Sequence, residues 1–239
     1  MRTSARIYVA AILALGGGVL AATWSTASHH GLGLAPSAVG FWLFFSLAAE
    51  CFWLETPTRA GMVSMSPAAN VASVFLLPTP LVLAVGAFSV GLSDLLLHRR
   101  GPLKAAFNAA QMVLSLGATL AVVHLLAGQV PVHGSLLIFE RPLAVLAAPV
   151  VFFLANTLLV SGVLGLVHGC SLWRAWRDNY GFGYQILSSS TLSLVGLLLV
   201  VSFDTLGYIA GVFFLLLFFF IRDSYHRYVR DRARRLHAA

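Results

Sequence analysis

The chain of 239 residues is 59% hydrophobic and 10% charged, with a formal net charge of +7. In soluble domains about a quarter of the residues are charged, so this composition excludes a soluble protein. In lipid every backbone polar group needs a partner, and the apolar runs of this chain lack inside-outside alternation; together these features predict membrane-spanning α-helices.

Eight apolar stretches are candidates for helices that enter or cross the membrane. They lie at 7–24, 39–54, 66–77, 80–97, 105–127, 142–167, 184–202 and 206–221. With a cytoplasmic N-terminus and alternating crossings, fourteen of the fifteen Lys and Arg residues fall in the cytoplasm and only Arg141 falls outside, in keeping with the positive-inside rule. We therefore expect an all-α integral membrane protein, a bundle of six to eight transmembrane helices with both termini in the cytoplasm. The expected domains are a polytopic transmembrane domain at 1–221 and a basic cytoplasmic helix or tail at 222–239.

The first stretch follows Arg2 and Arg6 and has some features of a cleaved signal peptide. Its apolar core from Ile7 to Trp24 is longer than the usual ~7–15 residues, which favours retention as the first span. The second stretch carries Glu50 near its cytoplasmic end.

The region from Ser64 to His98 is unusual for a membrane protein. Pro67 opens an apolar run of only about twelve residues, and a helix of that length reaches about 18 Å, short of the roughly 30 Å hydrocarbon core. We expect a short tilted hairpin or a re-entrant helix pair near 66–97. Interrupted helices are tolerated where they line a cavity, so a pocket is expected here.

The later stretches add a polar helix face, an interfacial segment and a long final helix. The polar face, made by residues three and four apart, consists of Asn108, Gln111, Ser115 and Thr119. Pro149 predicts a kink in the longest stretch, and the mixed aromatic and basic segment at 170–185 predicts a short helix in the cytoplasmic interface. Nucleic-acid binding, the other interpretation of that segment, does not suit about a dozen residues between two spans. No Gly or Pro separates the last stretch from the basic tail.

Polar side chains at membrane depth are the candidate site, because a carboxylate there costs ~2.5–3.5 kcal/mol. The candidate ligand-binding residues are Glu50, Asp94, Asn108 and Gln111. One interpretation is structural, with Asp94 in a salt bridge to Arg99 or Lys104. The other brings the four residues together in one polar site open to the cytoplasmic half.

The sequence carries no signature of catalysis, and we expect a non-enzymatic protein without a cofactor. The nucleophile-elbow, P-loop, zinc-protease and dinucleotide-binding patterns are missing. Cys51 and Cys170 form no CxxC pair and no His/Cys cluster, which gives little support to a metal site or a disulfide.

Several short runs of the chain carry a family resemblance. They are Met62–Ser66, Gly91–Asp94, His98–Gln111, Phe152–Thr157, Trp176–Asn179 and the closing helix. Together they resemble a multi-spanning membrane sensor region found N-terminal to HD-GYP phosphohydrolase and diguanylate cyclase domains in many bacteria. The resemblance implies a bacterial inner-membrane input module that signals through its last helix to a cytoplasmic effector. No output domain follows Ala239 in this sequence, so a role in cyclic-dinucleotide turnover is not carried over.

We therefore expect a sensory or ligand-binding membrane module. The alternatives are a substrate-binding membrane subunit of a small-molecule, vitamin-type transporter and a structural subunit of a membrane complex. The expected partners are membrane lipid, a small-molecule ligand and a cytoplasmic or membrane protein, and nucleic acid is not expected. Binding or transport requires the candidate residues to face a common cavity, whereas a scaffold requires them to be paired off.

Overall fold

The computed structural model describes residues 2–28, 36–55, 62–128, 140–180 and 184–238, with side chains left out at 54–55, 62–63, 184–185 and 229–238. Over these residues it has nine helices and two three-residue strands. The elements are α1 (Thr3–Ser28), α2 (Pro36–Cys51), β1 (Trp53–Glu55), β2 (Met62–Ser64), α3 (Ser66–Leu76), α4 (Thr79–Leu96), α5 (Pro102–Ala127), α7 (Pro142–His168), α8 (Leu172–Tyr180), α9 (Tyr184–Leu206) and α10 (Tyr208–Ala238).

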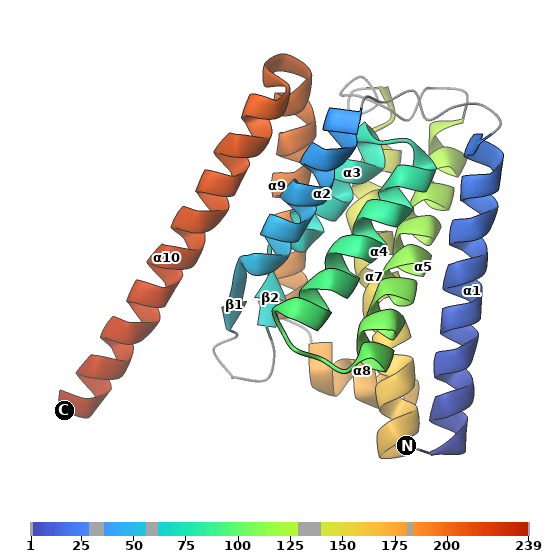
Figure 1. Ribbon diagram of the computed structural model, residues 1–239. Coiled ribbons are helices and arrows are strands. Elements are labelled where there is room, and N and C mark those ends of the chain that lie inside the picture. The colour runs from blue at the N-terminus through green and yellow to red at the C-terminus, as the bar shows by residue number, and fades with distance from the viewer. Residues whose placement is uncertain (1, 29–35, 56–61, 129–139, 181–183, 239) are drawn as a thin grey trace.

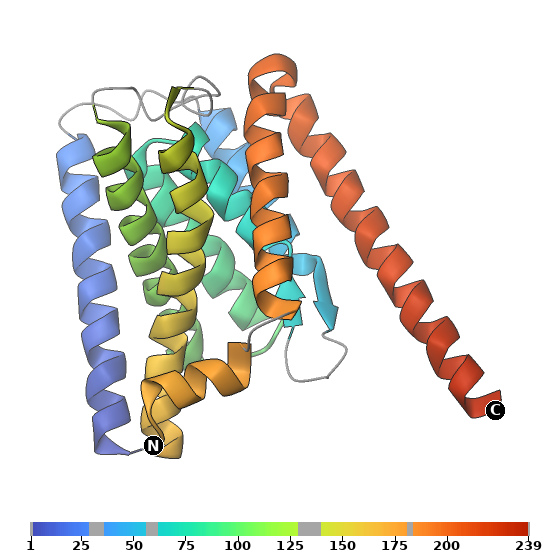
Figure 2. The same ribbon diagram turned by 180° about the vertical axis from the view of Figure 1, so that it is seen from behind.

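The helices form an upright bundle with a marked difference between its two ends (Figure 1). Both chain termini and α8 lie at one end, and α8 lies across that end of the bundle (Figure 2). The turn between α4 and α5 is at the same end, whereas α7 begins at the opposite end (Figures 1 and 2). The described cations therefore gather as the sequence predicts, and Arg141 at the start of α7 is at the far end. Arg59 lies outside the described residues.

Six described helices are long and apolar enough to cross a membrane: α1, α4, α5, α7, α9 and α10. Their outer faces expose large apolar side chains, such as Leu125 at 80% and Phe213 at 58%, which suits contact with lipid rather than water. The fold is thus an all-α, multi-pass membrane bundle, as predicted.

Two helices are too short to span the membrane unaided. At 1.5 Å per residue, α2 with 16 residues is about 24 Å long and α3 with 11 residues is about 16 Å long. The predicted short helix after Pro67 is therefore confirmed in α3, whereas α4, its expected partner, has the 18 residues of a candidate span.

The predicted second span at 39–54 is not helical to its end. Helix α2 ends at Cys51, and Trp53–Glu55 pairs antiparallel with Met62–Ser64, Trp53 lying opposite Ser64. The Met65 amide donates to the Phe52 carbonyl at 2.9 Å and closes this ladder just before α3 begins. Strand pairing gives these backbone groups the partners that a helix would have given them.

Helix α3 is the central element of the fold. Nine of its eleven residues are buried, and it packs mainly against α9. At the crossing, Gly196 of α9 lies so close to Ala68 that an added Cβ would overlap the Ala68 carbonyl. Small residues let membrane helices approach in this way.

Helix α10 leaves the bundle after a sharp turn at Gly207, whose φ of +57° suits glycine. It contacts α2, α9 and β1, then diverges from the other helices toward the C-terminus (Figure 1). The predicted domain border at residue 221 falls within this continuous helix, so the basic segment extends the last span without a break.

Candidate functional site

The buried carboxylate of Asp94 organises the junction of α4 and α5. Asp94 is 4% exposed at its side chain and pairs with Arg100, the Nη1 to Oδ1 distance being 2.7 Å. Asn108 of α5 donates its Nδ2 to the other carboxylate oxygen. The prediction of Arg99 or Lys104 as the partner was wrong: Arg99 takes a left-handed turn at φ 50°, and the Arg100 amide folds back onto the Asp94 carbonyl at 2.8 Å.

Glu50 at the end of α2 lies beside this junction. Its side chain is buried and is hydrogen-bonded by the hydroxyls of Ser66 and Ser64, within electrostatic reach of Asp94 and Arg100. The polar groups of α2, α4 and α5 therefore approach one another. Glu50, Asp94 and Asn108 form one polar cluster at the end of the bundle that holds both termini.

Gln111, the fourth candidate, is engaged with α7 instead. Its Nε2 donates to the side-chain oxygen of Asn156, to the Asn156 carbonyl at 3.2 Å and to Ser115 Oγ at 3.2 Å. The four predicted residues are thus divided between two polar groups, with Glu50, Asp94 and Asn108 in one and Gln111 in the other.

A polar cavity of about 210 Å³ separates these two groups. It is bounded by β2, α3, α7, α8 and α9, and its described lining comprises Ser64, Ser66, Pro67, Phe152, Phe153, Asn156, Thr157, Tyr180, Ser189 and Ser193. None of the four predicted residues lines it. Glu50 lies behind Ser64 and Ser66, and Gln111 lies behind Asn156, so each contacts the lining from outside.

The cavity wall carries hydroxyl groups that have no hydrogen-bond partner within the described part of the chain. Ser193 is only 2% exposed, and neither it, Ser189 nor Tyr180 takes part in a hydrogen bond among the described residues. Burial raises the pKa of Tyr180 to about 12. Because these hydroxyls line the cavity and have no partner within the described part of the chain, they suit a polar occupant.

Helix α8 closes the cavity at the end of the bundle where the termini lie. Trp176 is buried and donates its Nε1 to Thr157 Oγ1 at 2.9 Å, while Thr157 donates to the Phe153 carbonyl at 2.8 Å. This bond holds α8 against the middle of α7 and places Tyr180 at the cavity.

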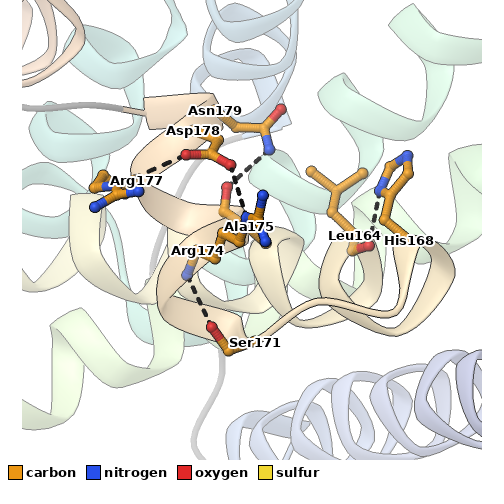
Figure 3. Close-up of polar contacts among 8 residues, drawn as sticks. All are labelled: Leu164, His168, Ser171, Arg174, Ala175, Arg177, Asp178 and Asn179. Carbon is orange, nitrogen blue, oxygen red and sulfur yellow. Dashed lines mark hydrogen bonds and ion pairs between the residues drawn. The ribbon is translucent and has the colours of Figure 1, made fainter.

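The outer face of α8 is charged, as the predicted interfacial helix requires. Arg174 and Arg177 both approach the carboxylate of Asp178, at 3.8 Å and 3.7 Å, in the exposed arrangement of Figure 3. Exposed pairs of this kind contribute little to stability. The guanidinium groups of Arg174 and Arg177 therefore add to the cations at this end of the bundle.

Of the cavity lining, the sequence had singled out the segment around Ser64 and Pro67, where a pocket was expected, but it gave no such expectation for Tyr180, Ser189 or Ser193. Serines in membrane helices commonly donate to a carbonyl one turn back, as Ser202 does to Leu198 at 2.8 Å. The sequence carries no signal that separates Ser193 from such a residue.

No family model, curated protein or solved structure matches the chain. Within the described ranges, no group of three or more His, Cys, Asp or Glu residues is placed to hold a metal ion. The lining instead offers hydroxyl groups, one carboxamide and two phenyl rings, an arrangement suited to holding a small polar molecule.

Proposed function

We propose that this protein is a non-enzymatic, multi-pass module of a bacterial inner membrane that binds a small polar molecule in the cavity between α3, α7, α8 and α9 and signals through α10 or a partner. The observation that carries the proposal is the Ser193 hydroxyl, which lines a polar cavity and has no hydrogen-bond partner within the described part of the chain. An apolar residue would avoid the desolvation cost at this position. A bound polar molecule gives the hydroxyl a partner.

The connection to α10 supports a signalling role over simple storage. Strand β2 supplies Ser64 to the cavity wall, its partner strand β1 contacts α10, and α2 contacts both α10 and β2. A ligand that moves the β1–β2 pair therefore acts directly on α10. This coupling is a hypothesis based on adjacency, and double variants of β1 and α10 would measure it.

The placement of the cations supports an orientation. Both termini and α8 share one end of the bundle (Figure 1), and basic residues favour the cytoplasmic side. In this proposal that end faces the cytoplasm. Reporter fusions at the N- and C-termini should be active only in the cytoplasm, and activity confined to the other side would reverse the orientation.

Native mass spectrometry of the protein extracted gently from membranes tests the ligand. We expect a copurifying small molecule, which disappears in Ser193→Leu because the larger side chain fills the cavity. Ser190→Leu is the matched control, since Ser190 is an exposed residue on the same helix. A protein without any small molecule in the wild type and both variants would contradict binding. Uptake of the identified molecule into proteoliposomes would favour the transporter alternative, and a stoichiometric protein partner would favour the structural subunit.

A further inference from the structure

We infer that the cavity takes an uncharged, hydroxyl-bearing molecule of about monosaccharide size, and that Glu50 and Gln111 position its hydrogen-bonding walls from behind. This inference rests on the proposed ligand-binding function and narrows it to a chemical class. Three observations carry it: the size of the cavity, the absence of charge in its described lining, and the fixed polarity of hydrogen-bonding groups at two places in that lining.

The size of the cavity limits the ligand to a small metabolite. The cavity measures about 210 Å³, whereas pockets for drug-sized ligands measure about 300–1,000 Å³. A ligand smaller than a drug molecule, of about monosaccharide size, fits.

The charge balance excludes an ionic ligand. All ten described lining residues are uncharged, and an unpaired charge buried away from water carries a large desolvation penalty. Glu50 is engaged by Ser66 and Ser64, and Arg100, a cation within electrostatic reach of Glu50, already pairs with Asp94. A phosphate, carboxylate or ammonium group would therefore lack a counter-charge in the described wall.

The first wall accepts hydrogen bonds. Ser64 and Ser66 share a hydroxyl–hydroxyl bond of 2.7 Å, and Glu50 lies within hydrogen-bonding reach of both hydroxyls. Of their two hydrogens, one serves the bond between them and the other is directed to the Glu50 carboxylate, so the remaining lone pairs are what these hydroxyls offer to the cavity. Glu50 thus makes this wall an acceptor for ligand O–H or N–H groups.

A second part of the wall, at Asn156, donates hydrogen bonds. The Ser115 hydroxyl donates to the main-chain carbonyl of Gln111 at 2.9 Å. The Gln111 side chain directs its Nε2 at the oxygen of the Asn156 carboxamide. That bond fixes which end of the Asn156 amide is used internally. The Nδ2 group, which has no acceptor among the described residues, remains for the ligand.

The rest of the lining favours a polyhydroxylated ligand. Ser189, Ser193 and Tyr180 carry hydroxyls that rotate and therefore either donate or accept. A ligand hydroxyl does the same, so it satisfies both the fixed walls and the adaptable groups between them. The rings of Phe152 and Phe153 supply apolar surface for the C–H face of a sugar or cyclitol ring.

The test compares matched neutral and charged probes with the purified protein in detergent. The neutral probes are glucose and myo-inositol, and the charged ones are glucose 6-phosphate and glucosamine. We expect a neutral probe to raise the thermal midpoint and bind more tightly than its charged counterpart, or a copurifying molecule that is neutral and hydroxylated. Ser193→Ala should weaken that binding about fivefold, from the loss of one hydrogen bond, with an unchanged midpoint in the absence of ligand. Ser190→Ala should bind as the wild type does.

The positioning role has its own readout. Gln111→Glu replaces a donor by an acceptor, which turns the Asn156 amide round and presents its oxygen to the cavity. We expect the affinity for the neutral ligand to fall at least tenfold in Gln111→Glu. It should fall less in Gln111→Asn, which keeps the amide. Equal losses of affinity in the two variants would contradict the positioning role. Tighter binding of a charged probe, or a charged copurifying molecule, would overturn the ligand class and leave the proposed function intact. No binding of any probe together with no copurifying molecule would overturn both.

Discussion

Adding a single methyl group to Gly16 should force α1 and α5 apart. A Cβ at this position would lie 2.7 Å from the Ala110 carbonyl oxygen and 2.8 Å from the Ala110 Cβ, whereas ordinary contact begins at 3.4 Å. The two helix backbones must therefore separate by about 0.6–0.7 Å, and overpacking of this kind costs about 1–3 kcal/mol. No long side chain can absorb the shift, because the obstructing atoms belong to the backbone and to an alanine.

Gly17 provides a control one residue away in the same helix. A Cβ there meets nothing within 4 Å, and Gly17→Ala gains the same helix propensity, up to about 1 kcal/mol, as Gly16→Ala. The difference between the two variants therefore isolates the packing cost. At roughly 2–4 °C per kcal/mol for a chain of this size, Gly16→Ala should melt roughly 2–12 °C below Gly17→Ala in detergent. Equal Tm values would refute the close approach of α1 and α5.

Three further predictions concern the site. Asp94→Asn should lower the free energy of unfolding by about 1–3 kcal/mol, measured by thermal unfolding, because a charged hydrogen bond to Arg100 is lost. Trp176→Phe should remove the bond to Thr157, at a cost of about 0.5–1.5 kcal/mol, and speed amide hydrogen exchange in α8. The pKa of Tyr180 is about 12 in the folded protein, against an ordinary 10.0, so this tyrosine ionises at lower pH in the unfolded chain. The free energy of unfolding should therefore fall between pH 10 and pH 12. Tyr180→Phe should remove that part of the pH dependence.

Each of these predictions has a matched control. Lys104 lies at the α4–α5 junction but is exposed and takes no part in the Asp94 ion pair. Lys104→Gln should therefore leave the Tm unchanged. Leu172→Ala changes an α8 side chain that is 48% exposed and should leave hydrogen exchange in α8 near the wild-type rate. For the pH experiment, the difference in tyrosine absorbance between wild type and Tyr180→Phe should titrate near pH 12. Titration near pH 10 would contradict the burial of Tyr180.

The spans and their alternation were predictable because the signals are local. Apolar run length and the positions of cations determine which segments cross and which ends share a side. The contact of Asp94 with Asn108 was also within reach, since both flank a short turn between adjacent helices. The specific partner Arg100 was not, because it depends on the left-handed conformation of Arg99, which no residue pattern in the turn required.

The sequence indicated one wall of the cavity, since a pocket was expected within Ser64–His98 and Ser64, Ser66 and Pro67 line it, but it did not indicate the other walls. Its walls come from five elements, and Ser66 meets Ser193 only because α3 packs against α9. Hydroxyl residues occur throughout membrane helices for local reasons, so their number gives no indication of which of them remain unpaired. The candidate residues Glu50 and Gln111 were found by their burial cost, yet each contacts the lining from behind, and only the three-dimensional arrangement reveals that position.

The shortness of α3 has a consequence for how the protein is assembled in the membrane. A helix of 11 residues that carries Ser66, Asn70 and Ser73 has too little apolar length to be stable in lipid alone. Its main neighbour, α9, is synthesised more than a hundred residues later. Insertion of this segment must therefore wait until most of the chain has been made, and a product truncated before α9 would leave α3 without its neighbour and open to the cell's proteases.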